Sequence, residues 1–398
     1  MLLVGLPIGL AIYQALAGGS DESAADRLRA DRAGSVSLGR FPSPLLPSRV
    51  PESYRISYRV ADTATDVGDM TTEEVKVRRP FDARIVVRDA NADAGNVRTE
   101  RLTVLTTLAA KSSDGRWTAF SIGPNLATSD LRFGPALDQA IEEGDIEVRE
   151  RRRVLGRECQ VFRAGSTLAA GILTPYERGA RDFADVCVDE AGLVVEEVWT
   201  LDGKRVQRRV AVEVDEDVAF DDDDPAFRLP ANVSRVSAAS GGGSARKLAE
   251  GSLPPGAFWD VGAGGLPEGF SPLGRWAVVT PNIEVMRDPT QASVPKTASS
   301  VSSVWVRGAD LLVVDQGVVS GSAGLPSPTT SRPVDLGGLG LGEAFTDFRT
   351  NEVRVSTGRA GEFVRIYGTL PLPLLVEVAR AMTVVPGNEL RYADDADA

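Results

Sequence analysis

Residues 187–206, CVDEAGLVVEEVWTLDGKRV, place apolar side chains at alternating positions between two turn signals. Alternation with a period of two is typical of a strand whose one face is buried in an antiparallel sheet. The turns are expected at 189–192 and at Asp202 and Gly203, and an Asp-Gly pair is a strong signal for a tight hairpin. This stretch therefore predicts strands that follow one another by hairpins, with no helical crossover.

The same pattern continues on both sides of that stretch. YRISYRV at 54–60 puts Tyr54, Ile56, Tyr58 and Val60 on one face. Further strands are expected at 73–80, 83–89, 97–109, 116–122, 145–155, 157–164, 183–189, 193–201 and 204–214. A helix is expected at 133–144, where Gly144 ends it. The fold class predicted for the chain is mainly β, of the α+β kind.

Composition excludes several classes of protein. The chain has 398 residues, a formal net charge of -12 and no histidine. The negative charge disfavours nucleic acid as a partner. The absence of histidine excludes Ser-His-Asp and Cys-His catalysis and histidine-based zinc sites. We therefore expect no enzyme, no cofactor and no metal, although carboxylate chemistry and calcium at the acidic stretch 215–224 stay open as alternatives.

The N-terminal region indicates export. Residues 1–19 are almost wholly apolar and end in a small-x-small pattern, so they predict a signal peptide or a membrane anchor. A buried N-terminal core helix is the alternative. Residues 20–51 are polar and rich in proline, which predicts a tether. The expected location is periplasmic or at the cell surface, in contact with the membrane through the N-terminal segment.

Export would place the two cysteines in an oxidising compartment. Cysteines in an oxidising compartment tend to pair, so Cys159 and Cys187 are predicted to form a disulfide between neighbouring strands. The alternative is two separate buried thiols.

Composition also divides the chain into domains. The first is expected at 52–224, a Ser/Gly/Ala-rich linker at 225–250 and a smaller sheet-and-helix domain at 251–398. In the second domain a helix is expected at 373–382, with Leu374, Leu375, Val378 and Met382 as its buried stripe.

Several of these stretches resemble known families. VKVRRPFDARIVVRD at 75–89, VLGRECQVFRAG at 154–165 and the hairpins at 186–212 resemble the lipoprotein-carrier family typified by LolA. The order of LPEGF at 266–270, the hairpin at 304–317 and the segment 364–382 resembles the MucB/RseB regulators of the envelope-stress sigma factor. Together these stretches cover most of residues 52–384.

The resemblance implies a fold and a function. The fold would be an open antiparallel half-barrel over helices, whose apolar cavity receives acyl chains. The chain would then be a membrane-associated, non-enzymatic binder of lipid or of the acyl chain of a lipoprotein or lipopeptide. The alternative is a protein-interaction module that regulates an anti-sigma factor or another envelope protein.

Residues 97–122 place apolar side chains on both faces of their expected strands. A sheet with one buried face requires apolar side chains on only one face. We therefore predict a ligand cavity in the first domain. Its expected lining is Val104, Leu105, Leu108, Trp117 and Phe120. The alternative is that the helix at 133–144 and the loop at 166–180 fill this space.

Overall fold

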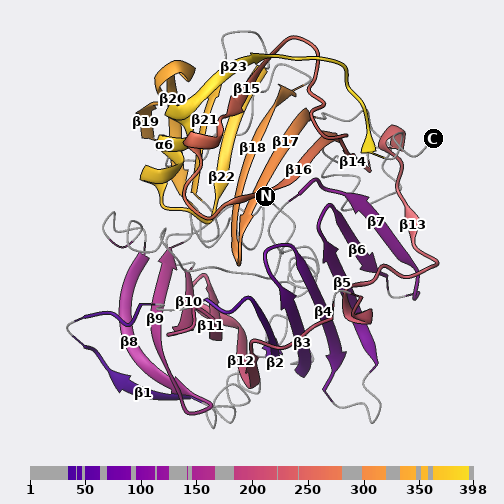
Figure 1. The fold of residues 1–398 in the computed structure, drawn as a ribbon. Coiled ribbons are helices and arrows are strands. Elements are labelled where there is room, and N and C mark those ends of the chain that lie inside the picture. The colour runs from indigo at the N-terminus through magenta and orange to yellow at the C-terminus, as the bar shows by residue number, and fades with distance from the viewer. Residues whose placement is uncertain are drawn as a thin grey trace.

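A computed structural model shows the architecture of the chain (Figure 1). It describes residues 35–41, 43–46, 50–62, 70–90, 96–112, 114–124, 141, 146–165, 183–221, 223–240, 242–279, 298–319, 332–346, 351–356 and 362–393. The expected N-terminal segment at 1–19 and the loop at 166–180 lie outside these ranges, as does the helix at 133–144 apart from Ile141. Within them no helix is both long and apolar enough to cross a membrane.

The described residues are mainly strands, in a 13-stranded, an 8-stranded and a 2-stranded sheet. The larger sheet has the order β1-β8-β9-β10-β11-β12-β2-β3-β4-β5-β6-β7-β13 (Figure 1). Its strands are β1 (Ser35–Gly39), β2 (Ser53–Asp62), β3 (Met70–Arg78), β4 (Asp82–Asp89), β5 (Val97–Val104), β6 (Thr107–Lys111), β7 (Trp117–Ser121), β8 (Ile146–Val154), β9 (Arg157–Gly165), β10 (Phe183–Asp189), β11 (Val194–Leu201), β12 (Lys204–Glu216) and β13 (Ser234–Arg235).

Hairpins build this sheet, as the alternating sequence predicted. Strands β2 to β7 pair antiparallel in chain order, and β8 to β12 do the same. The two series join where β12 pairs with β2. The hairpin between β11 and β12 turns at Asp202 and Gly203, which have φ angles of 47° and 76°. Both central residues have the positive φ that a tight primed turn requires.

One expected strand is two strands in the structure. The stretch at 97–109 turns at Leu105, whose φ is 43°, and Thr106, and the chain returns as β6 beside β5. Sequence alternation misses this turn because neither residue is a glycine, an asparagine or a proline.

The 8-stranded sheet has the order β14-β16-β17-β18-β22-β21-β20-β19. Its strands are β14 (Ser244–Lys247), β16 (Ser271–Val279), β17 (Ala298–Arg307), β18 (Asp310–Val319), β19 (Arg332–Asp335), β20 (Leu341–Thr346), β21 (Asn351–Ser356) and β22 (Glu362–Gly368). Helix α6 (Leu372–Ala381) packs on it, beside a small sheet of β15 (Ala257–Val261) and β23 (Met382–Pro386). The 3-10 segments are η2 (Pro225–Phe227), η3 (Ala238–Ser240), η4 (Ala263–Gly265) and η5 (Gly337–Leu339).

The expected apolar stripe of the C-terminal helix faces this sheet. Leu375 and Val378 are buried in one cluster with Ile366 of β22, and Leu374 packs against the same cluster. Met382 belongs to it too, although this residue begins β23 and lies beyond the helix.

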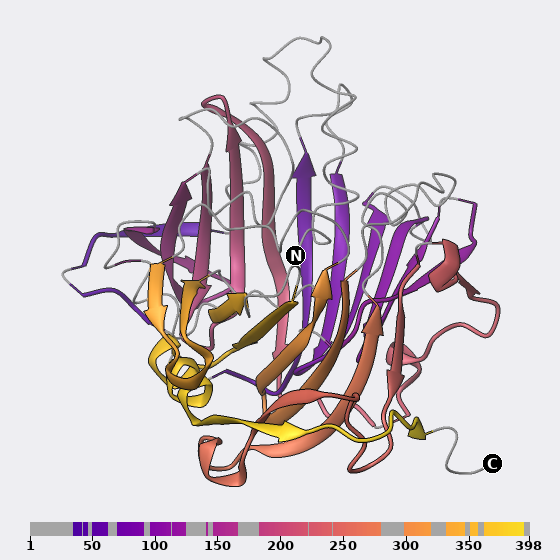
Figure 2. The ribbon, with the colours of Figure 1, turned by 90° about the horizontal axis from the view of Figure 1, so that it is seen from above.

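The two large sheets form separate layers (Figure 2). Buried side chains from both sheets pack together between them. Phe81, in the turn between β3 and β4, is buried in one cluster with Trp276, Val304 and Tyr367 of the 8-stranded sheet, and Leu105 packs against it. The Tyr367 hydroxyl also donates to the Pro124 carbonyl oxygen at 3.3 Å. An apolar contact therefore joins the two sheets.

Residues of the expected linker take part in both sheets. Strand β13 pairs in parallel with β7, and β14 pairs with β16. Between them Gly242 lies so close to the backbone that an added Cβ would be 2.1 Å from the Val236 carbonyl oxygen. Independent folding of the two expected domains stays a prediction.

Candidate functional site

The five residues predicted to line a cavity occupy three environments. Val104 and Trp117 pack in a cluster with Phe227 of η2. Leu105 lies in the turn and packs at the contact between the sheets. Leu108 and Phe120 are direct cross-strand partners, and both are buried. The structure therefore brings Leu108 together with Phe120 and Val104 together with Trp117, and it places Leu105 apart from both pairs.

Cys159 and Cys187 form a disulfide in the structure. The bond joins β9 to β10, which are neighbours in the sheet, and both cysteines are almost completely buried. They belong to one apolar cluster with Val161 and Val154.

A second apolar cluster lies on the opposite face of the same strands. Phe162 follows Val161 along β9, and Val186 precedes Cys187 along β10, so these residues point to the other side. They cluster with Val194 and Trp199 of β11 and with Ile146, Ala184 and Val188. We call this set the Phe162 face. Ile141 is among the residues that pack against it. Strands β9 and β10 are therefore apolar on both faces, a property that the sequence had suggested for β5 to β7.

The quoted sequence also contains two buried carboxylates, Glu196 and Glu197. Glu196 is 2% exposed and accepts from Arg152 Nη1 at 2.8 Å and from Arg208 Nε at 2.9 Å. Burial raises the pKa of Glu196, but the charges and hydrogen bonds of these two arginines outweigh burial and leave it lowered. Glu196 is therefore held ionised.

Glu197 differs from its neighbour. Its Oε1 accepts from Trp199 Nε1 at 2.6 Å and its Oε2 from Arg209 Nη1 at 3.3 Å. Burial raises the pKa of Glu197, the charge of nearby Glu73 adds to that increase, and Arg209 compensates only in part. The guanidinium of Arg209 also stacks over the Tyr58 ring at 3.5 Å.

Asp189 organises the first turn of the quoted stretch. Its Oδ1 accepts from the backbone N–H groups of Ala191 at 3.0 Å and Leu193 at 2.9 Å. Its Oδ2 accepts from Arg157 Nε at 2.7 Å. This carboxylate therefore has a structural role in closing the hairpin between β10 and β11.

The acidic stretch at 215–224 is also occupied by structural contacts. Asp215 accepts from Arg55 at 2.6 Å, Asp223 from Arg228 at 2.6 Å, and Asp224 caps η2 through the Ala226 N–H at 2.7 Å. Among the described residues no group of three potential ligands could hold a metal ion.

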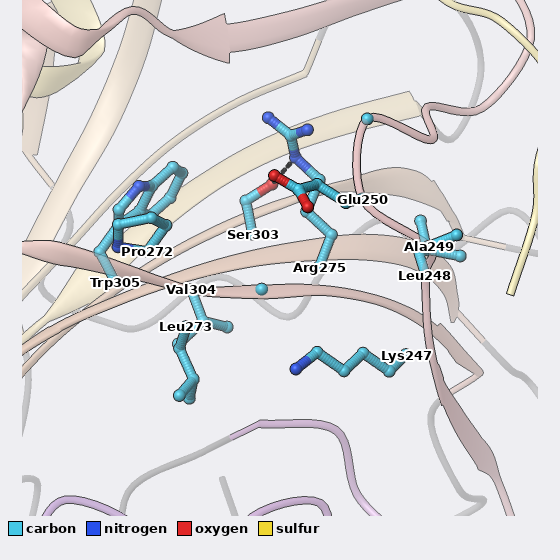
Figure 3. Close-up of a pocket in the computed structure, with 12 residues that line it drawn as sticks. Lys247, Leu248, Ala249, Glu250, Pro272, Leu273, Arg275, Ser303, Val304 and Trp305 are labelled. Atoms are coloured by element: carbon cyan, nitrogen blue, oxygen red, sulfur yellow. Dashed lines mark hydrogen bonds between the residues drawn. The ribbon is translucent and has the colours of Figure 1, made fainter. Parts of the chain in front are cut away.

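A pocket of about 350 Å³ lies in the 8-stranded sheet (Figure 3). It forms where β14 ends and the chain leaves the edge of β16. Trp305 and Pro272 line one end, Lys247 lies at the other, and Leu273 and Val304 are between them. Arg275 is held at the wall because its Nε donates to Ser303 Oγ at 3.2 Å and its Nη2 donates to Asp260 at 2.8 Å. The pocket thus combines an apolar wall with two cationic side chains, Lys247 and Arg275, and one carboxylate, Glu250.

Comparison with solved structures finds remote similarities. The chain is similar to MucB in the MucA/MucB complex of Pseudomonas aeruginosa, with 16% identity, a TM-score of 0.29 and coverage of 85% of this chain and 94% of that one. A second structure of MucB, in complex with periplasmic MucA, gives 15% identity, a TM-score of 0.27 and coverage of 92% and 100%. A LolA superfamily protein from Nitrosomonas europaea gives 10% identity, a TM-score of 0.21 and coverage of 51% and 96%. No family model and no curated protein matches the sequence.

Sequence reasoning missed the Phe162 face and the pocket. The alternation in 157–164 and 183–189 carried a signal for the face, since apolar residues stand at odd and even positions there. The pocket left no comparable signal, because Lys247, Arg275 and Ser303 come from three separate strands.

Proposed function

We propose that this chain is a non-catalytic, extracytoplasmic binding protein whose 13-stranded sheet receives the acyl chain of a lipid, lipoprotein or lipopeptide. The observation that carries the proposal is the Phe162 face. It is an apolar surface on the side of the sheet opposite to the core cluster that contains the disulfide, so this part of the sheet is apolar on both faces. Holding an acyl chain requires apolar area and shape, and each buried methylene contributes about 0.8 kcal/mol.

The Phe162 face is buried in this structure, with Phe162 at 1% exposure and Trp199 at 3%. Acyl binding therefore requires that some of the side chains packed against the Phe162 face move away from it. Ile141 is one of these side chains. The cross-strand pair of Leu108 and Phe120 is the second part of the sheet where the proposal places an apolar ligand.

The first experiment is mass spectrometry of lipid that co-purifies with the folded protein, followed by uptake of a fluorescent fatty acid. Val186→Phe should fill the Phe162 face and reduce probe uptake. Val161→Phe is the matched control, since it enlarges a neighbouring residue in the opposite cluster. Overpacking there should destabilise the protein by about 1–3 kcal/mol without a specific effect on the probe.

Absence of both co-purified lipid and probe uptake in the wild-type protein would reject acyl binding. Equal loss of uptake in both variants at equal stability would also reject the Phe162 face as the site.

The second candidate function is a protein-interaction module that regulates an anti-sigma factor or another envelope protein. The pocket favours it, because this pocket opens where β14 leaves β16 and is lined there by backbone and by the charged side chains of Lys247, Glu250 and Arg275. Arg275 is paired with Asp260, so Lys247 is the cation of the lining that we test. The test uses the extracytoplasmic part of a membrane-bound anti-sigma factor from the same organism as the captured protein. Lys247→Glu should weaken its capture, and Lys204→Glu, on another exposed strand end, should not. Unchanged capture by the Lys247 variant would reject this surface.

A further inference from the structure

Residues 35–41 and 43–46, which we call the strap, lie on the outer edge of the larger sheet. Part of the expected tether forms β1 here, and β1 pairs antiparallel with β8 (Figure 1). The register places Ser35 opposite Val154 and Val36 opposite Arg153. The strap therefore occupies a sheet edge, the kind of surface that accepts an added strand from another segment.

Polar contacts hold the strap at both ends. The Ser35 hydroxyl donates to Glu196 Oε2 at 3.0 Å, and the Leu45 N–H donates to Gln160 Oε1 at 3.2 Å. Between them Arg151 donates to the Ser43 carbonyl oxygen at 2.9 Å and stacks over the Phe41 ring at 4.4 Å.

The receiving groups are built into the sheet. Gln160 is 2% exposed, and its Nε2 donates to the Arg149 carbonyl oxygen at 2.9 Å at a bulge in β8. Glu196 is fixed by Arg152 and Arg208. Both side chains are thus held in position to accept hydrogen bonds, Glu196 from the Ser35 hydroxyl and Gln160 from the Leu45 backbone N–H.

The apolar side chains of the strap are only partly buried. Val36 is 62% exposed, Phe41 46% and Leu46 36%, whereas Leu38, Pro44 and Leu45 are half-buried. A segment held mainly by hydrogen bonds, with no described side chain fully buried, belongs to the low-stability part of a protein and opens without global unfolding.

We propose that the strap is a reversible latch. The outer edge of β8, together with Gln160 and Glu196, is a binding site for an extended peptide, and the strap occupies that site in this structure. The site binds this segment from its own chain, and it binds the same segment supplied as a separate peptide when the latch opens. This inference is independent of the proposed lipid function, since it concerns a sheet edge and not an apolar face.

The test uses the full chain and a fluorescent peptide with the sequence of residues 35–46, SVSLGRFPSPLL. Fluorescence anisotropy should show binding to the wild-type chain. Ser35→Ala in the chain weakens its own strap, so that variant should bind the peptide more tightly, by about tenfold if a hydrogen bond to a charged group is lost. The peptide with Ser35→Ala should bind more weakly by a similar factor.

A disulfide cross-link between the strap and β8 tests whether the peptide binds at this edge or at another surface. Val36→Cys with Arg153→Cys places two cysteines at opposed, exposed positions of β1 and β8. The oxidised double variant should not bind the peptide, whereas each single variant should bind as the wild-type chain does. Failure of both the wild-type and the Ser35→Ala chains to bind, or equal binding by the cross-linked chain, would overturn the proposal.

Discussion

Glu196 and Glu197 are consecutive, buried residues of β11 whose pKa values shift in opposite directions. Their side chains point to opposite faces of the sheet. Glu196 meets two arginines, whereas Glu197 shares Arg209 with Glu73. One carboxylate is therefore stabilised as an ion, and the other is destabilised by burial and by a like charge.

Opposite pH dependence should follow from this pair. The pKa of Glu196 is lowered on folding, so its contribution to stability is present above its ordinary value of 4.5 and is lost as the pH falls. The pKa of Glu197 is raised, so its contribution is present below 4.5 and is lost as the pH rises through the folded value. Urea unfolding of Glu196→Gln and Glu197→Gln between pH 4 and pH 7 should therefore show opposite trends relative to the wild type. Parallel trends would contradict the assignment.

Removal of the disulfide should destabilise the first sheet. The bond closes a loop with a sequence separation of 28, for which the chain-entropy relation gives about 3–4 kcal/mol. Cys159→Ala with Cys187→Ala should lower the free energy of unfolding by that amount under oxidising conditions. Under reducing conditions the wild type and the variant should converge. A difference that persists after reduction would indicate lost packing instead.

Phe81 should couple the two large sheets. Because it is buried in the cluster between them, Phe81→Ala should cost about 3–5 kcal/mol and separate the unfolding of the sheets. Phe227→Ala is the control, since Phe227 is equally buried but packs within the first sheet. Calorimetry should show two transitions for the first variant. A single transition in both variants would mean that other contacts couple the sheets.

Asp189 should be needed for the hairpin between β10 and β11. Asp189→Ala removes the acceptor of two backbone N–H groups and leaves Arg157 without this partner, so we expect a loss of about 3 kcal/mol. Glu213→Ala breaks an exposed ion pair with Arg55 and should cost less than about 1 kcal/mol. Equal effects on the free energy of unfolding would refute the role of Asp189.

Much of the larger sheet could be predicted from local patterns. The alternation in YRISYRV and the Asp-Gly turn in the quoted stretch each depend on side chains within a few residues, and β2 and the hairpin of β11 and β12 appear as expected. The site was harder to predict. Leu105 was chosen as a cavity residue on the assumption that it lies within a strand. The chain turns at this residue, whose φ is 43°, and the sequence pattern gives no sign of that turn.

The sequence by itself determined the antiparallel strands, their hairpin order, the absence of histidine chemistry and a reason for pairing Cys159 with Cys187. Tertiary structure alone decided that Ser35 of β1 reaches Glu196 of β11, although β8, β9 and β10 lie between them in the sheet. The physical reason is the distance along the chain over which each effect acts. Alternation and turn propensity act between neighbours along the chain, whereas the curl of a sheet sums the twist of many strands and the packing of their faces. That curl sets which distant polar groups meet, and so it places the strap, the buried carboxylates and the Phe162 face.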